Sequence, residues 1–209
     1  GVSGIGKSRL LNEVRIRALV KGMAVFVGQA IISGGQPFQI WRDILRRLIF
    51  MTEVDDVELS ILKMISPDLA TLLGRTIDDA EENDPANAQN RLLAVIENLF
   101  RRQTQPMLIL LEDIQWASEE SIILLKRIGA IADELPLLII ASYRDDEAPE
   151  MDSTFADANH IKLQSLTPDA IVDLSTSMIG DTGHNAAIAD LLQNHTEGNA
   201  FLLIEIVRT

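Results

Sequence analysis

Glycine, lysine and serine have a distinctive spacing at the start of this chain. The first eight residues read Gly-Val-Ser-Gly-Ile-Gly-Lys-Ser, and apolar residues at helical spacing follow directly. Glycines let a backbone curl so that its amides point inward, and a helix that follows directs the positive end of its dipole at the same place. The order Gly-x-x-x-x-Gly-Lys-Ser before a helix is the pattern of a phosphate-binding P-loop.

The P-loop predicts a site for a nucleoside triphosphate and magnesium. Lys7 would add a point charge to the β- and γ-phosphates, and Ser8 would offer its hydroxyl to Mg²⁺. The residues that we expect to bind the nucleotide are Gly1, Val2, Ser3, Gly4, Ile5, Gly6, Lys7, Ser8 and Arg9.

The hydrophobic pattern along the chain alternates helices with short apolar strands. Such an order indicates a parallel sheet with crossover helices, followed by helices only. Asp84 and Pro85 are expected to begin a long helix as its N-cap and first residue, and residues 33–37 are expected to form a loop. We expect strands at 24–28, 107–111, 137–142 and, weakly, 161–163, and helices at 7–20, 38–49, 57–64, 67–73, 85–102, from 118, 167–179, 185–194 and 199–207.

Two acidic residues end the apolar run Met107–Leu111. Glu112 and Asp113 there match the Walker B arrangement, in which a strand tip delivers carboxylates to the metal and to the attacking water. Counting along the common pattern puts Glu112 at the metal position and Asp113 at the position of the catalytic base. The reverse assignment stays open, because aspartate is the commoner metal partner. The predicted metal ligands are Ser8, Glu112 and Asp113.

Arg144 follows the apolar run at 137–142, and it has two interpretations. An arginine at a strand tip can reach the γ-phosphate and report its presence. The same side chain can instead pair with Asp145, Asp146 or Glu147 on the loop that follows. Likewise, the arginine pairs at 46–47 and 101–102 could each supply an arginine finger to a neighbouring subunit or simply line a solvated helix face.

Composition and charge exclude several classes of function. The 209 residues contain no cysteine, so thiolate metal sites and disulfide frameworks are excluded, and a reducing, cytoplasmic location fits. The net charge of −13 opposes nucleic-acid binding by this segment. No apolar run approaches the ~18 residues that a membrane span needs. Because a strand normally leads into a P-loop and Gly1 is the first residue, we expect the chain to be part of a longer protein.

Four segments together resemble the AAA-type ATPase module of STAND signalling proteins, large multidomain regulators of bacteria. They are Gly1–Leu10, Glu112–Ser118, Ser142–Arg144 and the run Thr-Glu-Gly-Asn-Ala-Phe-Leu at 196–202, and Gly-Gly-Gln-Pro-Phe at 34–38 is also similar. The resemblance covers nearly the whole chain. It departs from the family pattern at Gln115, where histidine is usual, and at Ala200, where proline is usual.

The resemblance implies a fold and a set of roles. The fold would be a three-layer α/β/α P-loop NTPase domain at residues 1–165 with sheet order 5-1-4-3-2, lacking its first strand here. A small helical lid would begin at 166 and continue to 209. Glu112, Asp113 and Arg144 would be catalytic, with Arg144 as the sensor arginine, and the turn at 198–200 would lie near the adenine.

Function follows from the same resemblance. The chain would bind and hydrolyse ATP with Mg²⁺ and act as a nucleotide-dependent switch inside a signalling protein. Its partners would be ATP or ADP, helical repeats and an output domain of the same polypeptide, and other copies of itself. A nucleotide-binding scaffold without significant hydrolysis is the alternative. Because the first strand is central in this sheet order, we expect weak nucleotide binding by the 209-residue chain. Roughly ten further upstream residues, a strand and its turn, should restore binding.

Overall fold

A parallel sheet organises the larger of two compact units in this protein. The computed structural model describes residues 1–32, 36–79 and 85–208, and it contains one compact unit of residues 11–142 and another of residues 1–10 with 143–209. In the first unit, β1 (Ala24–Gln29), β2 (Met107–Glu112) and β3 (Leu137–Ala141) pair in the order β1-β2-β3. Both pairings are parallel and place Phe26 opposite Ile109 and Ile109 opposite Ile139.

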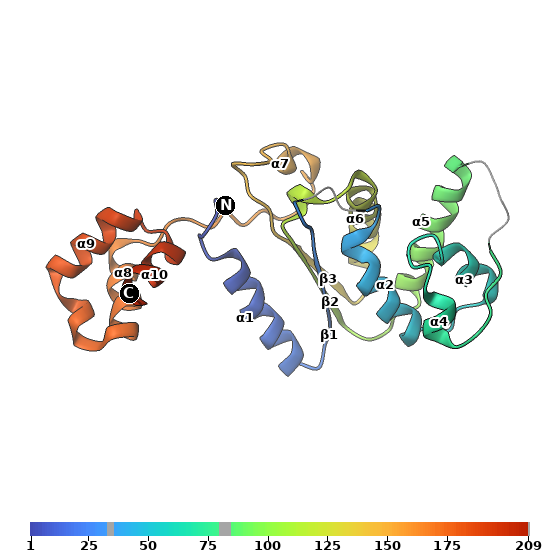
Figure 1. Ribbon diagram of the computed structural model, residues 1–209, viewed down its shortest axis with the longest axis horizontal. Coiled ribbons are helices and arrows are strands. Elements are labelled where there is room, and N and C mark those ends of the chain that lie inside the picture. The colour runs from blue at the N-terminus through green and yellow to red at the C-terminus, as the bar shows by residue number, and fades with distance from the viewer. Residues whose placement is uncertain (33–35, 80–84, 209) are drawn as a thin grey trace. The chain divides into compact units, whose positions relative to one another are not determined.

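Helices cover both faces of this sheet (Figure 1). On one face, Leu11 and Ala18 of α1 (Lys7–Val20) pack against Leu108 and Leu110 of β2. Because side chains alternate along a strand, Met107, Ile109 and Leu111 point to the opposite face. The helices on that side are α2 (Gln39–Met51) and α6 (Glu119–Ile131). All five apolar residues of β2 are buried, as expected for a strand covered on both faces.

Further helices extend the core beyond α2. The indole of Trp41 meets the ring of Phe100 edge to face, with centroids 6.3 Å apart, and its Nε1 donates to the backbone oxygen of Ser121 at 3.0 Å. Phe100 lies near the end of α5 (Pro85–Arg101), against which α3 (Asp56–Leu62) packs, and α4 (Leu69–Leu73) follows α3. The predicted inward residues of α5 are all buried, namely Leu92, Val95, Ile96, Leu99 and Phe100.

The second unit contains a three-helix cluster with its own small core. The helices are α8 (Pro168–Ile179), α9 (Ala186–Thr196) and α10 (Ala200–Arg208), and their buried contacts are Ile171, Leu192 and Leu203. Thr167 caps α8, because its side chain accepts from the backbone of Ala170. The short helix α7 (Met151–Thr154) and the 3-10 turns η1 (Ile114–Trp116), η2 (Ala132–Glu134) and η3 (Gly180–His184) complete the described elements.

The predicted parallel α/β sheet is confirmed, with strands close to the predicted 24–28, 107–111 and 137–142, and the strand prediction at 161–163 is wrong. Residues 161–163 form no strand in the described chain, and Ile161 is 81% exposed. Alternation over only three residues does not determine which strand would pair with this segment. Without a partner strand, its backbone N–H and C=O groups would lack hydrogen bonds within a sheet. β3 is less covered than an apolar run suggests, with Leu138 50% exposed, because in the described chain it pairs along one edge only. The expected loop at 33–35 and the N-cap at Asp84 lie outside the described residues.

Candidate nucleotide site

The P-loop adopts the backbone that its glycines allow. Gly4 has φ +76° and Gly6 has φ +108°, both in the left-handed region that residues with a side chain rarely enter. Ile5 between them is buried and anchors the loop. Helix α1 begins at Lys7, and the amide of Leu10 donates to Gly6 O at 3.0 Å. The positive end of the helix dipole therefore lies at the loop, as phosphate binding requires.

Lys7 reaches back across its own loop. Its Nζ donates to the backbone oxygens of Gly1 at 2.7 Å and of Val2 at 2.8 Å. Ser8 and Arg9, in the first turn of α1, are exposed. The lysine ammonium is thus held next to the loop by carbonyl groups, which a phosphate oxygen with its full charge can replace.

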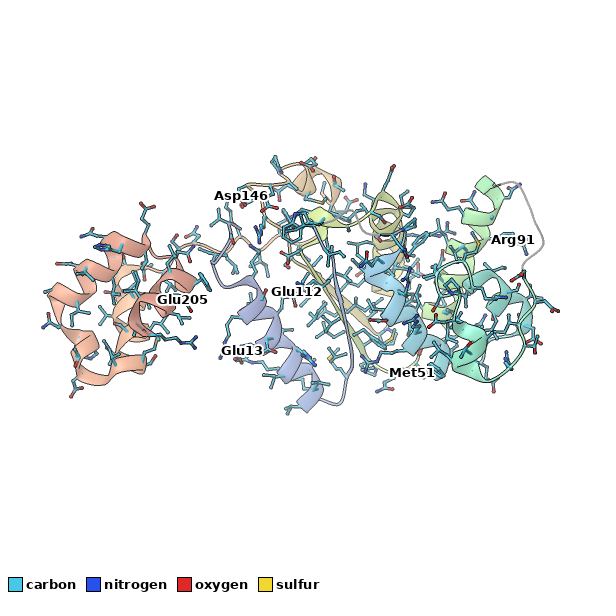
Figure 2. The ribbon with its side chains drawn as sticks, viewed as in Figure 1. Glu13, Met51, Arg91, Glu112, Asp146 and Glu205 are labelled. Atoms are coloured by element: carbon cyan, nitrogen blue, oxygen red, sulfur yellow. The ribbon has the colours of Figure 1, made fainter. Side chains whose placement is uncertain are left out.

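The predicted Walker B carboxylates lie at the end of the central strand. Glu112 is the last residue of β2 (Figure 2), and Asp113 follows it with φ 56° and ψ 43°. This left-handed backbone costs an aspartate on the order of 1 kcal/mol, and such strain concentrates at functional sites. Ser142 holds the turn, because its Oγ accepts from Asp113 N at 3.3 Å and its backbone oxygen accepts from Ile114 N at 3.0 Å.

A capped helix follows the strand tip. Gln115 lies in η1, and Ser118 then begins α6 as its N-cap, with its side chain accepting from Ser121 N at 3.3 Å. Glu119 and Glu120 occupy the first turn, where acids complement the helix dipole. The predicted start of this helix is confirmed.

Arg144 forms a loop ion pair in this structure. Its Nη1 donates to Glu147 Oε1 at 2.5 Å, which is one of the pairings that the sequence allows, and the sensor role of this residue stays a prediction. The same segment lies beside the P-loop, since the nitrogen of Gly1 is 3.4 Å from Tyr143 O and 3.5 Å from Asp145 Oδ1. Lys162 hydrogen-bonds to the Asp145 carboxyl and lowers its pKa.

Tyr143 is the centre of a second polar cluster in the same unit. Its hydroxyl donates to Asp152 Oδ1, and His160 Nδ1 lies 3.4 Å from that hydroxyl. Burial, and then the Asp152 carboxylate, raises the pKa of Tyr143 to about 12. These contacts hold the chain that follows β3 in place beside the first residues of the P-loop.

The turn before α10 contacts the P-loop directly, which sequence reasoning missed. Asn199 Nδ2 donates to Ser3 O at 3.0 Å, and Phe201 N donates to Gly4 O at 3.1 Å. The resemblance suggested only that this turn lies near the adenine. A sequence signal did exist, because asparagine after glycine and before an apolar helical run is a typical N-cap, but an N-cap does not say what else the side chain touches.

Both arginine pairs are engaged in contacts within the fold. Arg46 binds both carboxylate oxygens of Asp68 at 2.7 Å, and Arg47 lies over the ring of Phe26. Arg101 pairs with Glu97 and Glu134, and Arg102 pairs with Glu58. In this structure Arg46, Arg101 and Arg102 form ion pairs, whereas Arg47 contacts an aromatic ring.

The predicted site residues divide between the two compact units. The P-loop residues to Arg9 and Arg144 belong to one unit, and Glu112 and Asp113 belong to the other. Within the described ranges, no group of three or more His, Cys, Asp or Glu side chains is placed to hold a metal ion. A P-loop magnesium site draws on a hydroxyl, few carboxylates and phosphate oxygens, so it does not need such a group.

Comparison with known families decides the identity of this arrangement. Residues 1–140 match the AAA ATPase domain family. The chain belongs to that family. The match includes the P-loop and the tip of β2, whereas Arg144 and the helices α8 to α10 lie beyond it in this AAA ATPase domain protein. Comparison with curated proteins gives no match.

No described helix of this AAA ATPase domain protein combines the length and apolar character needed to cross a lipid bilayer.

Proposed function

We propose that this protein binds ATP with magnesium and hydrolyses it slowly, as a regulatory switch within a larger signalling protein. The observation that supports the proposal most strongly is the complete P-loop joined to α1 within the matched AAA ATPase domain. Family membership supports nucleotide binding and hydrolysis in general. The role in signalling, the attached helical repeats and output domain, self-association and a cytoplasmic location rest on the resemblance alone.

The residues of the loop fit a triphosphate. Apart from its two chain neighbours, no described residue has an atom within 4 Å of the position that a Cβ on Gly6 would take, so the loop leaves space at Gly6. The hydroxyl of Ser8 and the carboxylates of Glu112 and Asp113 are the hard oxygen donors that Mg²⁺ prefers. When bound, magnesium would neutralise charge on the phosphate oxygens. Lys7 would leave the carbonyls of Gly1 and Val2 for the β- and γ-phosphates.

The strand tip would supply the base. In the proposed assignment, Asp113 accepts a proton from the attacking water and Glu112 orients the metal shell. Asp113 has a left-handed backbone at the end of β2, a strained conformation of the kind that concentrates at functional sites. If the two roles are exchanged, substitution of Asp113 would weaken magnesium binding and substitution of Glu112 would stop turnover.

One observation favours the scaffold alternative. The pairing of Arg144 with Glu147 occupies the guanidinium that would otherwise sense the γ-phosphate. A protein that keeps this pair when ATP binds would hold nucleotide without rapid hydrolysis. In the switch, Arg144 would exchange Glu147 for phosphate.

Single-turnover hydrolysis of ATP with magnesium tests the proposal. Asp113→Asn should keep ATP binding and stop turnover, since asparagine also tolerates the left-handed backbone but cannot accept the proton. Asp133→Asn, at an exposed acid of the same unit, is the matched control and should hydrolyse normally. Unchanged turnover in Asp113→Asn would show that it is not the base, and no turnover in the wild type would favour the scaffold.

The open edge of β3 supports a further part of the proposal. Leu138 is half exposed although the strand is entirely apolar, so a further parallel strand along this edge would bury it. This is the place that the expected sheet order gives to the strand before a P-loop. The boundary between an NTPase domain at 1–165 and a helical lid at 166–209 also remains a proposal, and the clustering of α8, α9 and α10 around Leu203 supports it.

A further inference from the structure

Asn199 uses both ends of its side-chain amide. Its Oδ1 accepts from the backbone amides of Phe201 at 3.1 Å and Leu202 at 3.2 Å, which caps α10. Its Nδ2 donates to Ser3 O in the P-loop at 3.0 Å. One side chain therefore begins the last described helix and holds the loop at the same time.

The backbone adds a second bond between the same two segments. Phe201 N donates to Gly4 O at 3.1 Å as well as to its own cap. A P-loop that binds phosphate turns its amides inward, so carbonyl groups between them face outward. The carbonyls of Ser3 and Gly4 are the groups that the start of α10 binds.

The approach is close enough to require glycine at two positions. A Cβ on Gly4, which has φ +76°, would lie 2.6 Å from Asn199 Oδ1 and 2.8 Å from Nδ2. Gly198, also at φ +76°, holds the turn from the other side, because its oxygen accepts from Leu166 N at 2.8 Å. A Cβ on Gly198 would lie 2.5 Å from Leu166 O. The turn is thus fixed between the P-loop and the segment that precedes α8.

We propose that Asn199 is a positioning residue that couples nucleotide binding in the P-loop to the docking of helix α10. The inference rests on the proposed nucleotide site. A nucleotide that orders the loop with its carbonyls outward strengthens both bonds to α10, and a docked α10 holds the loop ready for phosphate. The two effects are equal in free energy, because coupling between binding events is reciprocal.

Asn199→Asp separates the coupling from the helix cap. Aspartate keeps the acceptor for the amides of Phe201 and Leu202, and it loses the donor to Ser3 O. Asn199→Ser removes the amide donor to Ser3 O without adding charge and keeps a side-chain oxygen that can cap the helix. Asn185 caps α9 by accepting from Ala187 N at 2.9 Å, so Asn185→Asp is the matched control for an added charge at a helix cap.

Two measurements on the same variants test the proposal. Calorimetry gives the Kd for ADP with magnesium, and hydrogen exchange with and without ADP gives the protection of the first turn of α10. In the wild type and in Asn185→Asp, ADP should slow exchange of the Phe201 and Leu202 amides. In Asn199→Asp and Asn199→Ser that slowing should be lost, and ADP should bind about 3- to 10-fold more weakly, the usual effect of one lost hydrogen bond.

The outcomes are distinguishable. Loss of the ADP-dependent slowing in both Asn199 variants, with the control unchanged, supports the coupling. A merely structural role would raise exchange equally with and without ADP and leave the Kd unchanged, and this result overturns it. If ADP binds to the Asn199 variants and slows amide exchange in α10 as much as in the wild type, the coupling is also overturned, but the proposed function is not. Failure of the wild type to bind ADP even weakly overturns both.

Discussion

Replacement of Gly4 by alanine should weaken the contact between the P-loop and α10 by more than the strain of its left-handed backbone accounts for. Gly4 has φ +76°, and the new Cβ would enter the space of the Asn199 amide. Gly22, in the turn between α1 and β1, has the same φ of +76°, but, its two chain neighbours aside, no residue that the structure describes has an atom within 4 Å of its Cβ position. The two glycines therefore differ in crowding and share their backbone strain.

The magnitudes follow from this difference. Alanine in the left-handed region costs roughly 1–2 kcal/mol, which is the whole effect expected for Gly22→Ala. In Gly4→Ala the Asn199 side chain must also move, and it loses hydrogen bonds that contribute about 0.5–1.5 kcal/mol each. The expected total is about 2–4 kcal/mol, of which about half comes from Asn199.

Native-state hydrogen exchange measures both costs locally. The opening free energy is followed at the amide of Leu203, which donates to the backbone oxygen of Asn199, for Gly4→Ala and at the amide of Met23 for Gly22→Ala. In a background of Asn199→Ala, the cost of Gly4→Ala should fall to that of Gly22→Ala, because the crowded side chain is gone. Equal costs for the two glycine substitutions in the original background would refute the reasoning.

Two predictions concern titration. Tyr143 is the only tyrosine in the chain, so the ultraviolet absorbance of its phenolate should show a midpoint at about 12. Because this pKa is raised on folding, the associated stability is present below pH 10, the ordinary tyrosine value, and is lost as the pH rises toward 12. A midpoint at the ordinary value would show that the hydroxyl is not held as described. Glu97→Gln should lower the free energy of unfolding by about 1 kcal/mol near neutral pH. The hydrogen bond from Arg127 lowers the pKa of Glu97, so this difference is present above the ordinary value of 4.5 and should vanish as the pH falls below it. A difference that stays constant in urea unfolding across that range would contradict the assignment.

Helix α1 and strand β2 could be predicted from the sequence, and both have the expected extent within one residue. The apolar residues of β2 are required by packing on both sides of the sheet. Helix α1 was predictable because the P-loop pattern places a helix directly after its last glycine. The strand predicted at 161–163 does not form, because three residues with one charged side chain do not determine a neighbouring strand with which to pair. Burial of β3 depends on a neighbouring strand rather than on its own apolar sequence.

The candidate site was predictable where backbone chemistry determines it. Gly4 and Gly6 predicted the curled loop, and both have positive φ. The partner of Arg144 could not be chosen from spacing, because three acids follow it within reach and only the fold selects Glu147. The contact of Asn199 with Ser3 joins residues at the two ends of the chain, and no local pattern reports such a pairing.

The most direct test of the central claim is calorimetry of ATP with magnesium on the wild type and on Lys7→Ala. Removal of the ammonium should weaken ATP binding about 100-fold or more, because a charge-assisted contact to phosphate contributes roughly 1.5–3 kcal/mol and Lys7 is expected to make more than one. Lys21→Ala, at an exposed lysine just after α1, should bind ATP like the wild type. If Lys7→Ala binds ATP as tightly as the wild type does, the P-loop is not the nucleotide site and the account is wrong.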